Sequence, residues 1–340
     1  MGQDTAIENV FATSWLKRAR RAVGLSCLLC AMTTAFPSWS MAEGGMNADA
    51  NELSAEELAD KIVRDSRGNG FLEWKAVVGR VDILPVLLER MKSEGPSTKR
   101  HLVRMAVAVG SQAKPEQGRW CYSQPAARFL VSVLMQETNL DVRDKAAQLL
   151  VNNFPSSYIA PLAPDILKVV RQSQPLDERI RLLGKTGCAE ARSLLLADEQ
   201  FRKESAAGTD MALARLGDVE RSLKFVKAYE ATKNPEEKAR LAADLGYIGD
   251  ASCVMALARS IRCPMIYERG AARVAVRIEI VRALGEVYPE TKVFWVDLMN
   301  RPTNDSWYAS VEEWLVRHLG VKWDKPRPPY FYSEIRPDPR

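Results

Sequence analysis

Two short motifs have residue types and spacing that could support acyl transfer. Ser111 and Lys114 fit S-x-x-K, and Lys185-Thr186-Gly187 fits K-T-G. Enzymes that form a serine acyl intermediate with these motifs need the serine at a helix start and K-T-G on a strand edge. Here helix-forming stretches flank Lys185-Thr186-Gly187 on both sides, which places it in a corner between helices. We therefore expect both matches to arise by chance.

The chain offers little else for acid–base or metal chemistry. His101 and His318 are its two histidines, and neither is followed by glutamate. Two isolated histidines cannot build a multi-histidine site, so we expect both to have packing roles. The pairs Glu236-Glu237 and Glu312-Glu313 are expected to cap helices or face water. The sequence predicts no catalytic residue, no metal and no cofactor.

Four cysteines lie outside the N-terminal apolar run: Cys121, Cys188, Cys253 and Cys263. Their even number permits two disulfides in an oxidising compartment without requiring them. If Cys253 and Cys263 share one helix, they lie about 15 Å apart along its axis, too far to bridge. We expect buried free thiols.

The N-terminus has the order of an export signal. Basic residues Lys17 to Arg21 precede an apolar run from Ala22 to Phe36, and the small residues Ser40-Met41-Ala42 follow. This order predicts a signal peptide over 1–42, cleaved after Ala42, and a periplasmic or secreted protein. An uncleaved anchor is the alternative. Residues 43–52 are small and polar, which predicts a disordered linker.

Composition and charge describe an ordinary globular chain. The 340 residues are 46% hydrophobic and 27% charged. The net charge of +5 falls to about +3 without the predicted signal, which carries four basic and two acidic residues. Positive and negative residues are mixed throughout, without the concentrated basic face of a nucleic-acid binder. We expect no nucleic-acid partner.

A recurring phrase predicts the elements that position these residues. Its clearest form runs from Val276-Arg277 to Leu284-Gly285, an apolar helical stretch that ends in Leu-Gly before a turn and a second helix. The terminal apolar residue of each copy falls at Val78, Val109, Leu150, Leu183, Leu213, Leu245, Leu284 and Leu319. Spacing of this length is typical of stacked helix pairs. We predict an all-α solenoid of about seven to eight pairs over 53–320.

The corners of these pairs have their own signals. Gly217-Asp218 and Gly249-Asp250 combine a glycine that can end one helix with an aspartate that can cap the next, and Gly187-Cys188 is a variant. Ser54 and Glu57 form a capping box at the first helix. Small residues such as Ala242 and Ala283 should let neighbouring helices approach closely.

The phrase resembles V-R-x-x-A-A-x-A-L-G-x-I-G-D of HEAT repeats, in particular the short HEAT-like class also found in bilin-lyase proteins. Val276-Arg277 to Val287, Val142-Arg143 to Leu150 and Leu241 to Asp250 match best. The resemblance implies an α-solenoid whose second helices line the concave face. The chain lacks the His-Glu pairs of HEAT-like metal hydroxylases, so that activity is not expected.

Basic residues recur on the predicted second helices: Arg192, Arg221, Lys224, Lys227, Arg259, Arg262 and Lys292. If these helices line the inner curve, the residues form a shallow surface for an acidic protein or polyanion. An ordinary solvated face is the alternative, because Glu220 and Glu230 dilute the charge.

Aromatic residues, among them Trp307 and Trp323, are concentrated near the C-terminus, where a Pro-rich and aromatic-rich tail spans 321–340. The open end of a solenoid exposes half of a core and needs a cap. We expect the aromatics to supply that cap, and an anchor for a partner or glycan is the alternative.

These features favour an exported, noncatalytic scaffold that binds a protein partner along its surface. Two alternatives remain: an envelope enzyme, either a lyase or a cell-wall hydrolase, and a polysaccharide- or peptidoglycan-binding module that uses the C-terminal aromatics.

The export signal can be checked directly. When the full chain is expressed in a bacterial host, mass spectrometry of the extracytoplasmic fraction should find a mature N-terminus at Glu43, because Ser40-Met41-Ala42 presents the small residues that signal peptidase requires. An intact N-terminus held in the membrane fraction would instead indicate an uncleaved anchor.

Overall fold

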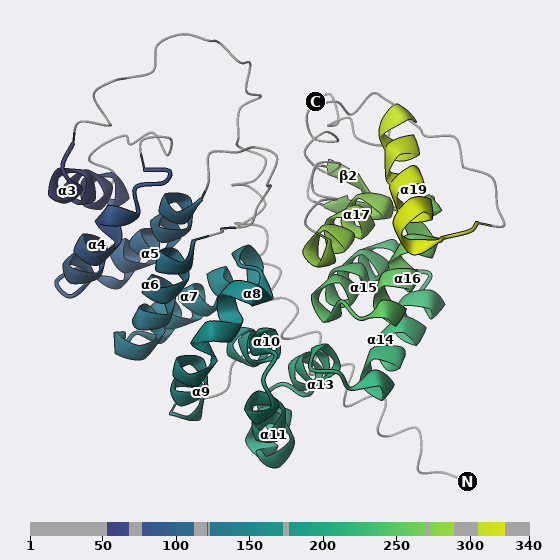
Figure 1. Ribbon diagram of the computed structural model, residues 1–340, viewed down its shortest axis with the longest axis horizontal. Helices are drawn as coiled ribbons and strands as arrows, with labels where there is room; N and C mark the ends of the chain where they lie inside the picture. The colour runs from purple at the N-terminus through teal and green to yellow at the C-terminus, as the bar shows by residue number, and fades with distance from the viewer. Residues whose placement is uncertain are drawn as a thin grey trace.

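The computed structural model describes residues 53–67, 77–111, 121, 123–172, 177–269, 272–288 and 305–323, without the side chains of 269, 272–273 and 305–308. In this part of the chain, helices pack against one another in two layers that follow a curved path (Figure 1). The predicted all-α solenoid is confirmed. The predicted signal peptide, the linker 43–52 and the tail beyond Trp323 lie outside the described residues.

One layer consists of the helices that carry the recurring phrase. They are α5 (Pro96–Gly110), α7 (Leu140–Asn153), α10 (Asp177–Thr186), α13 (Ala206–Arg215), α15 (Pro235–Ile248) and α17 (Val276–Val287). Each contacts the next in this series. The phrase residues Val109, Leu150, Leu183, Leu213, Leu245 and Leu284 are buried in them.

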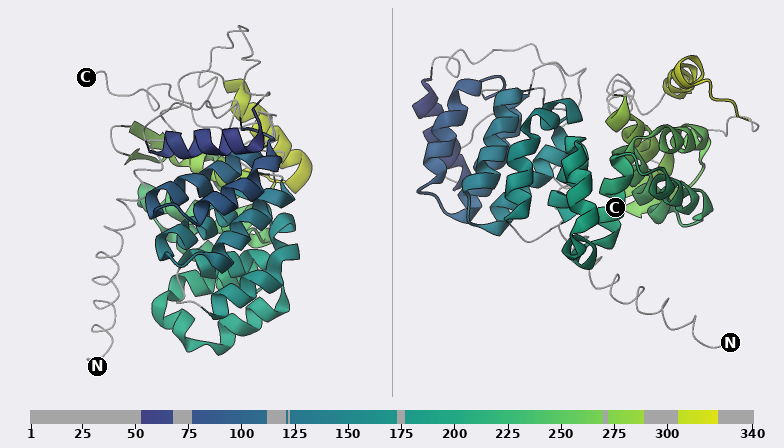
Figure 2. Two further views of the ribbon diagram at one scale, coloured as in Figure 1. Left: turned by 90° about the vertical axis from the view of Figure 1, so that its left-hand side faces the viewer. Right: turned by 60° about the horizontal axis from the view of Figure 1, so that its bottom comes forward.

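The second layer covers the first from one side. It contains α4 (Leu84–Met91), α6 (Gln124–Gln136), α9 (Ala163–Arg171), α11 (Ala189–Ala197), α14 (Val219–Ala231) and α16 (Ala251–Arg259). Helix α3 (Ala55–Ser66) precedes them and α19 (Asp305–Leu319) lies at the other end (Figure 2). Short pieces connect the layers: η2 (Val81–Ile83), α8 (Ser156–Ile159), η4 (Ala160–Leu162), α12 (Glu199–Glu204) and η5 (Ser260–Arg262).

The corners follow the sequence closely. Gly217 and Gly249 have φ of +94° and +71°, the left-handed conformation that glycine adopts without steric cost. Asp218 then accepts a hydrogen bond from the backbone of Arg221, and Asp250 from that of Cys253. The capping box is also present, since Ser54 accepts from the Glu57 amide at 3.2 Å. These predictions are confirmed.

The direction of curvature differs from the expectation. Figure 1 shows the phrase-bearing helices on the inner side of the curve and α11, α14 and α16 on the outer side. The cause is small residues between consecutive inner helices. A Cβ on Gly246 of α15 would lie 2.7 Å from the carbonyl oxygen of Ala283 in α17, so the backbones themselves touch. Closer packing in one layer bends the stack toward that layer, and the expectation that second helices line the inner curve is wrong for this chain.

Two local features depart from the repeat pattern. A hairpin of β1 (Ile266–Arg269) and β2 (Ala272–Ala275) precedes α17, with Tyr267 paired with Val274. Aromatic and β-branched residues at these positions favour extended backbone. Val78 lies in a turn before η2 instead of ending a helix.

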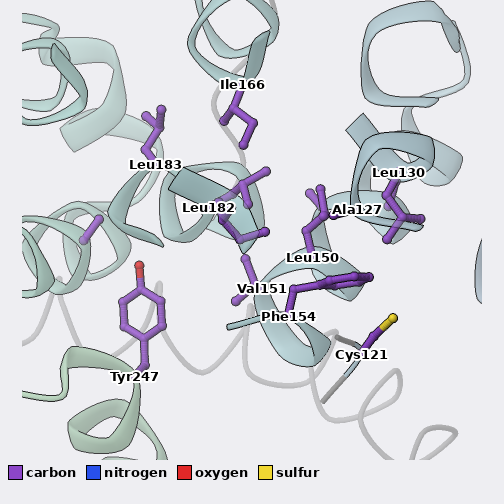
Figure 3. Packing of buried hydrophobic residues seen from close by; sticks show 14 of the residues in the cluster. Cys121, Ala127, Leu130, Leu150, Val151, Phe154, Ile166, Leu182, Leu183 and Tyr247 are labelled. Atoms are coloured by element: carbon purple, nitrogen blue, oxygen red, sulfur yellow. The ribbon is translucent and has the colours of Figure 1, made fainter. Parts of the chain in front are cut away.

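The buried core is continuous along the stack. Figure 3 shows Phe154 between Leu150 and Cys121, at the C-terminal end of α7. Cys121 donates its backbone N–H to the carbonyl of Asn153 at 2.6 Å, which joins the segment before α6 to the end of α7. Each inner helix between α5 and α17 packs on both of its neighbours in the layer.

The close packing of α15 on α17 generates a stability test. Ala242 is fully buried one turn before Gly246, whereas Ala243 on the same helix is exposed. Ala242→Leu should lower the free energy of unfolding by about 1–3 kcal/mol through overpacking. Ala243→Leu, the matched control, should change it by less than about 0.5 kcal/mol. Urea denaturation followed by circular dichroism measures both, and equal effects would contradict the proposed helix contact.

Candidate functional site

Of the residues that match acyl-transfer motifs, Lys185 has a structural role. Lys185 is buried at the end of α10, where its Nζ donates to the carbonyls of Val151 and, at 2.8 Å, Phe154. Those groups belong to the end of α7, where free carbonyls attract a cation. The corner position predicted for Lys185-Thr186-Gly187 is confirmed, with Gly187 at φ +68°. Ser111 follows the end of α5 instead of starting a helix, and Lys114 lies outside the described residues.

The histidines contact neighbouring side chains as isolated groups. His318 stacks on Trp314 one turn earlier, with ring centroids 4.6 Å apart, and its Nδ1 lies 3.0 Å from the Trp314 carbonyl oxygen. The Nε2 of His101 is 3.6 Å from Asp65, and burial lowers the pKa of the imidazole. Within the described residues no three His, Cys, Asp or Glu side chains gather as a metal site.

The four cysteines described are free thiols, of which Cys121 and Cys253 are buried, as expected, whereas Cys188 and Cys263 are partly exposed. Burial raises the pKa of Cys121 to about 12, and it also raises the pKa values of Cys253 and Cys263. A thiol with a raised pKa is a poor nucleophile at neutral pH. Cys263 follows η5 and so does not share α16 with Cys253.

The predicted basic residues separate into two kinds. Arg192, Lys224, Lys227 and Arg259 are exposed on α11, α14 and α16. Arg221 forms ion pairs with Asp210, at 2.7 Å, and with Asp218, so its charge is neutralised within the fold. Lys292 and the side chain of Trp307 lie outside the described residues.

Arg262 and Trp323 belong to the packing at the C-terminal end. The guanidinium of Arg262 donates to both carboxylate oxygens of Glu312, at 3.0 and 3.1 Å, and lies 4.5 Å from the centroid of the Trp323 ring. Glu312 is buried, so the expectation of a capping or solvated role for it is wrong. Its i+1 neighbour Glu313 is exposed, which shows that adjacent carboxylates on one helix face different environments. Trp323 packs partly buried against the core, consistent with the capping role expected of the aromatics.

Large apolar side chains accompany the exposed basic residues on the outer side. Val219, Leu223 and Leu196 are 64%, 42% and 43% exposed. Val219 and Leu223 are one turn apart on α14, and Leu196 is one turn after Arg192 on α11. Burial raises the pKa of Asp218, beside Val219, but the hydrogen bonds and charge of Arg221, together with the charge of Arg192, outweigh that effect and lower it. Both α11 and α14 contact α13. We call this set the outer patch: Arg192, Leu196, Val219, Leu223, Lys224 and Lys227.

The inner side has a feature that the sequence pattern did not reveal, a polar contact that we call the Tyr247 clasp. The Tyr247 hydroxyl donates to the carbonyl of Arg181 at 2.5 Å, so α15 reaches α10 across α13. Figure 3 shows Tyr247 pointing toward Leu182 and Leu183 of α10. Arg215 of α13 donates to the Tyr247 carbonyl and, at 2.6 Å, to the Ser156 hydroxyl. Both guanidinium groups lie near the tyrosine ring, at 4.8 Å for Arg181 and 5.0 Å for Arg215.

Carboxylates and arginines around the Tyr247 clasp interact electrostatically. Burial raises the pKa values of Glu178 and Asp244, and nearby Arg181 opposes both shifts. Glu286 of α17 interacts electrostatically with Arg181 and Arg215. The arrangement fixes four helices in a charged network. The sequence pattern did not predict this network because its residues are far apart in the chain. The one sequence signal for it is Gly184, where a Cβ would collide with the Tyr247 hydroxyl.

The clasp predicts a pH-dependent stability. Tyr247→Phe removes a buried hydrogen bond and should cost about 1 kcal/mol at pH 7. Burial raises the pKa of Tyr247 to about 12 from an ordinary value of 10, so the folded state holds this proton more tightly than the unfolded state. The resulting stability is complete below pH 10 and is lost between pH 10 and 12, by about 2–3 kcal/mol.

The comparison of wild type with Tyr247→Phe isolates this residue from other groups that titrate at high pH. Urea unfolding at pH 7, 10 and 11.5 should show the wild-type advantage shrinking above pH 10. If the difference in free energy of unfolding between the two proteins stays constant with pH, the Tyr247 hydroxyl is not the source of the pH dependence.

No family model, no curated protein and no solved structure matches this chain.

Proposed function

We propose that this protein is an exported, noncatalytic scaffold of the HEAT-like kind that binds a protein partner with an acidic surface. The observation that carries the proposal is the outer patch. It combines three large exposed apolar side chains with three exposed cations on α11 and α14, two helices of the outer layer that both contact α13.

The apolar members of the outer patch support a protein partner. A single exposed apolar residue is normal, but a group of them rimmed by polar residues is typical of interaction surfaces. Val219, Leu223 and Leu196 each leave a substantial part of their apolar area exposed, so a partner that covers them gains hydrophobic free energy.

The charged members support an acidic partner. Arg192, Lys224 and Lys227 form no ion pair within the described residues, in contrast to Arg221 between them. Their exposed charges can attract carboxylates of a partner and speed association. Glu220 lies on the same helix, which favours a partner that places its acidic residues beside the cations over one with uniform negative charge.

The location of the protein belongs to the same proposal. The basic stretch, apolar run and Ser40-Met41-Ala42 support export, and with it a partner in the envelope or outside the cell. Among the helices described, none is both long and apolar enough to cross a membrane.

The outer patch can be tested by affinity capture from the envelope fraction of cells that express the protein. Wild type should recover a partner in stoichiometric amount. Lys224→Glu/Lys227→Glu should reduce recovery at least tenfold by placing like charges opposite the acidic partner, and Val219→Ser/Leu223→Ser should do so by removing apolar contacts.

Met135→Ser is the matched control, because Met135 is 44% exposed on α6, away from the outer patch. It should leave recovery unchanged. The proposal fails if no partner is recovered by wild type, or if the charge-reversed and control variants capture the same amount.

A further inference from the structure

Three cations gather on the inner side of the curve, where the proposed function does not use them. Arg100 and Arg104 lie one turn apart on the exposed face of α5, and Lys145 lies half-buried on α7, the next helix of the inner layer. Because α4 and α6 cover the other side of these helices, the exposed face of each points into the curve (Figure 1). We call these residues the inner cation group.

Several cations elsewhere on the inner layer are paired with carboxylates. Arg179 pairs with Asp144 at 2.7 Å, Arg240 with Asp244 at 2.9 Å and Arg282 with Glu279 at 3.5 Å. Arg100 and Arg104 form no ion pair with any described residue, and Lys145 donates to the neutral side-chain oxygen of Gln148 at 2.8 Å. The inner cation group therefore keeps a net positive charge that the fold does not neutralise.

The pKa of the Lys145 ammonium group reflects the nearby positive charges. Burial, as the largest cause, and the charges of Arg104 and Arg100 together lower its pKa to about 8, against the opposing effect of Glu178 on α10. Glu178 also interacts with Arg181, and Asp141 lies one turn before Lys145 on its own helix. Even with these acidic groups nearby, the lysine ammonium is destabilised. Like charges held together at a cost are typical of a site that a ligand of opposite charge completes.

We propose that Arg100, Arg104 and Lys145 form a binding site for an oxyanion-bearing ligand, either a phosphate or a carboxylate compound, inside the curve of the solenoid. Two guanidinium groups one turn apart can each donate two hydrogen bonds to an oxyanion, and the lysine adds a point charge. An anion between them favours the charged form of the lysine and so opposes the effects of burial and of the two arginines on its pKa. Binding at pH 8 therefore carries a signature, the uptake of a proton by Lys145. This site is independent of the outer patch, which lies on the opposite side of the helix layers.

Isothermal titration calorimetry at pH 8 and low ionic strength tests the site. Pyrophosphate and triglutamate serve as the two probes, each measured in Tris and in HEPES, whose ionisation enthalpies differ. The expected result is binding of at least one probe with uptake of up to about half a proton, because a group of pKa 8 is half protonated at that pH. The probe that binds more tightly identifies phosphate or carboxylate chemistry.

The variants separate this site from general electrostatic attraction. Arg104→Met should weaken binding about tenfold by removing charge-assisted hydrogen bonds. Lys145→Met should abolish proton uptake. Arg128→Met, an exposed arginine on α6, is the control and should change neither quantity. The proposal is overturned if neither probe binds wild type, or if proton uptake persists without Lys145.

Discussion

The Tyr247 clasp is the interaction on which the shape of this molecule depends. In a solenoid, each repeat ordinarily contacts its immediate neighbours alone. Here the Tyr247 hydroxyl bonds to Arg181 across the intervening α13, and Arg215 reaches Ser156 across α10. Contacts that skip a helix are possible on the inside of a sharp bend. They hold α10, α13 and α15 at a fixed curvature, and this curvature separates the inner cation group from the outer patch.

Small residues and buried cations act together to join successive helices. Gly184 and Gly246 allow neighbouring helices to approach closely. Long basic side chains reach the carboxyl ends of two helices from a neighbouring helix. Lys185 satisfies carbonyls at the end of α7, and Lys238 donates to the Tyr229 carbonyl in the last turn of α14 at 2.7 Å. Because these cations are buried with partners, they contribute to the fold, whereas the exposed lysines of α14 remain available for binding.

Much of the architecture could be predicted from the sequence because the signals are local. Corners need glycine with positive φ and an aspartate cap, and both can be recognised from adjacent residues such as Gly249-Asp250. The side toward which the stack curves could not be predicted in this way, since it depends on how closely Gly246 approaches Ala283 on another helix. The same limit applies to single charges. Lys224 and Arg221 are both basic residues on α14, but Arg221 also pairs with Asp210 of α13, a contact that the tertiary fold creates.

The clasp also has a consequence for how the chain folds. Helical repeats with neighbour contacts alone can nucleate anywhere and grow one repeat at a time. The Tyr247–Arg181 bond joins residues 66 positions apart, so the segment from α10 to α15 gains its full stability when all of its helices are in place. This central segment should therefore act as one cooperative block, while α3 to α6 at one end and α19 at the other open and close more independently. Slow hydrogen exchange concentrated at the bend, with faster exchange toward both ends, is the pattern that such an arrangement produces.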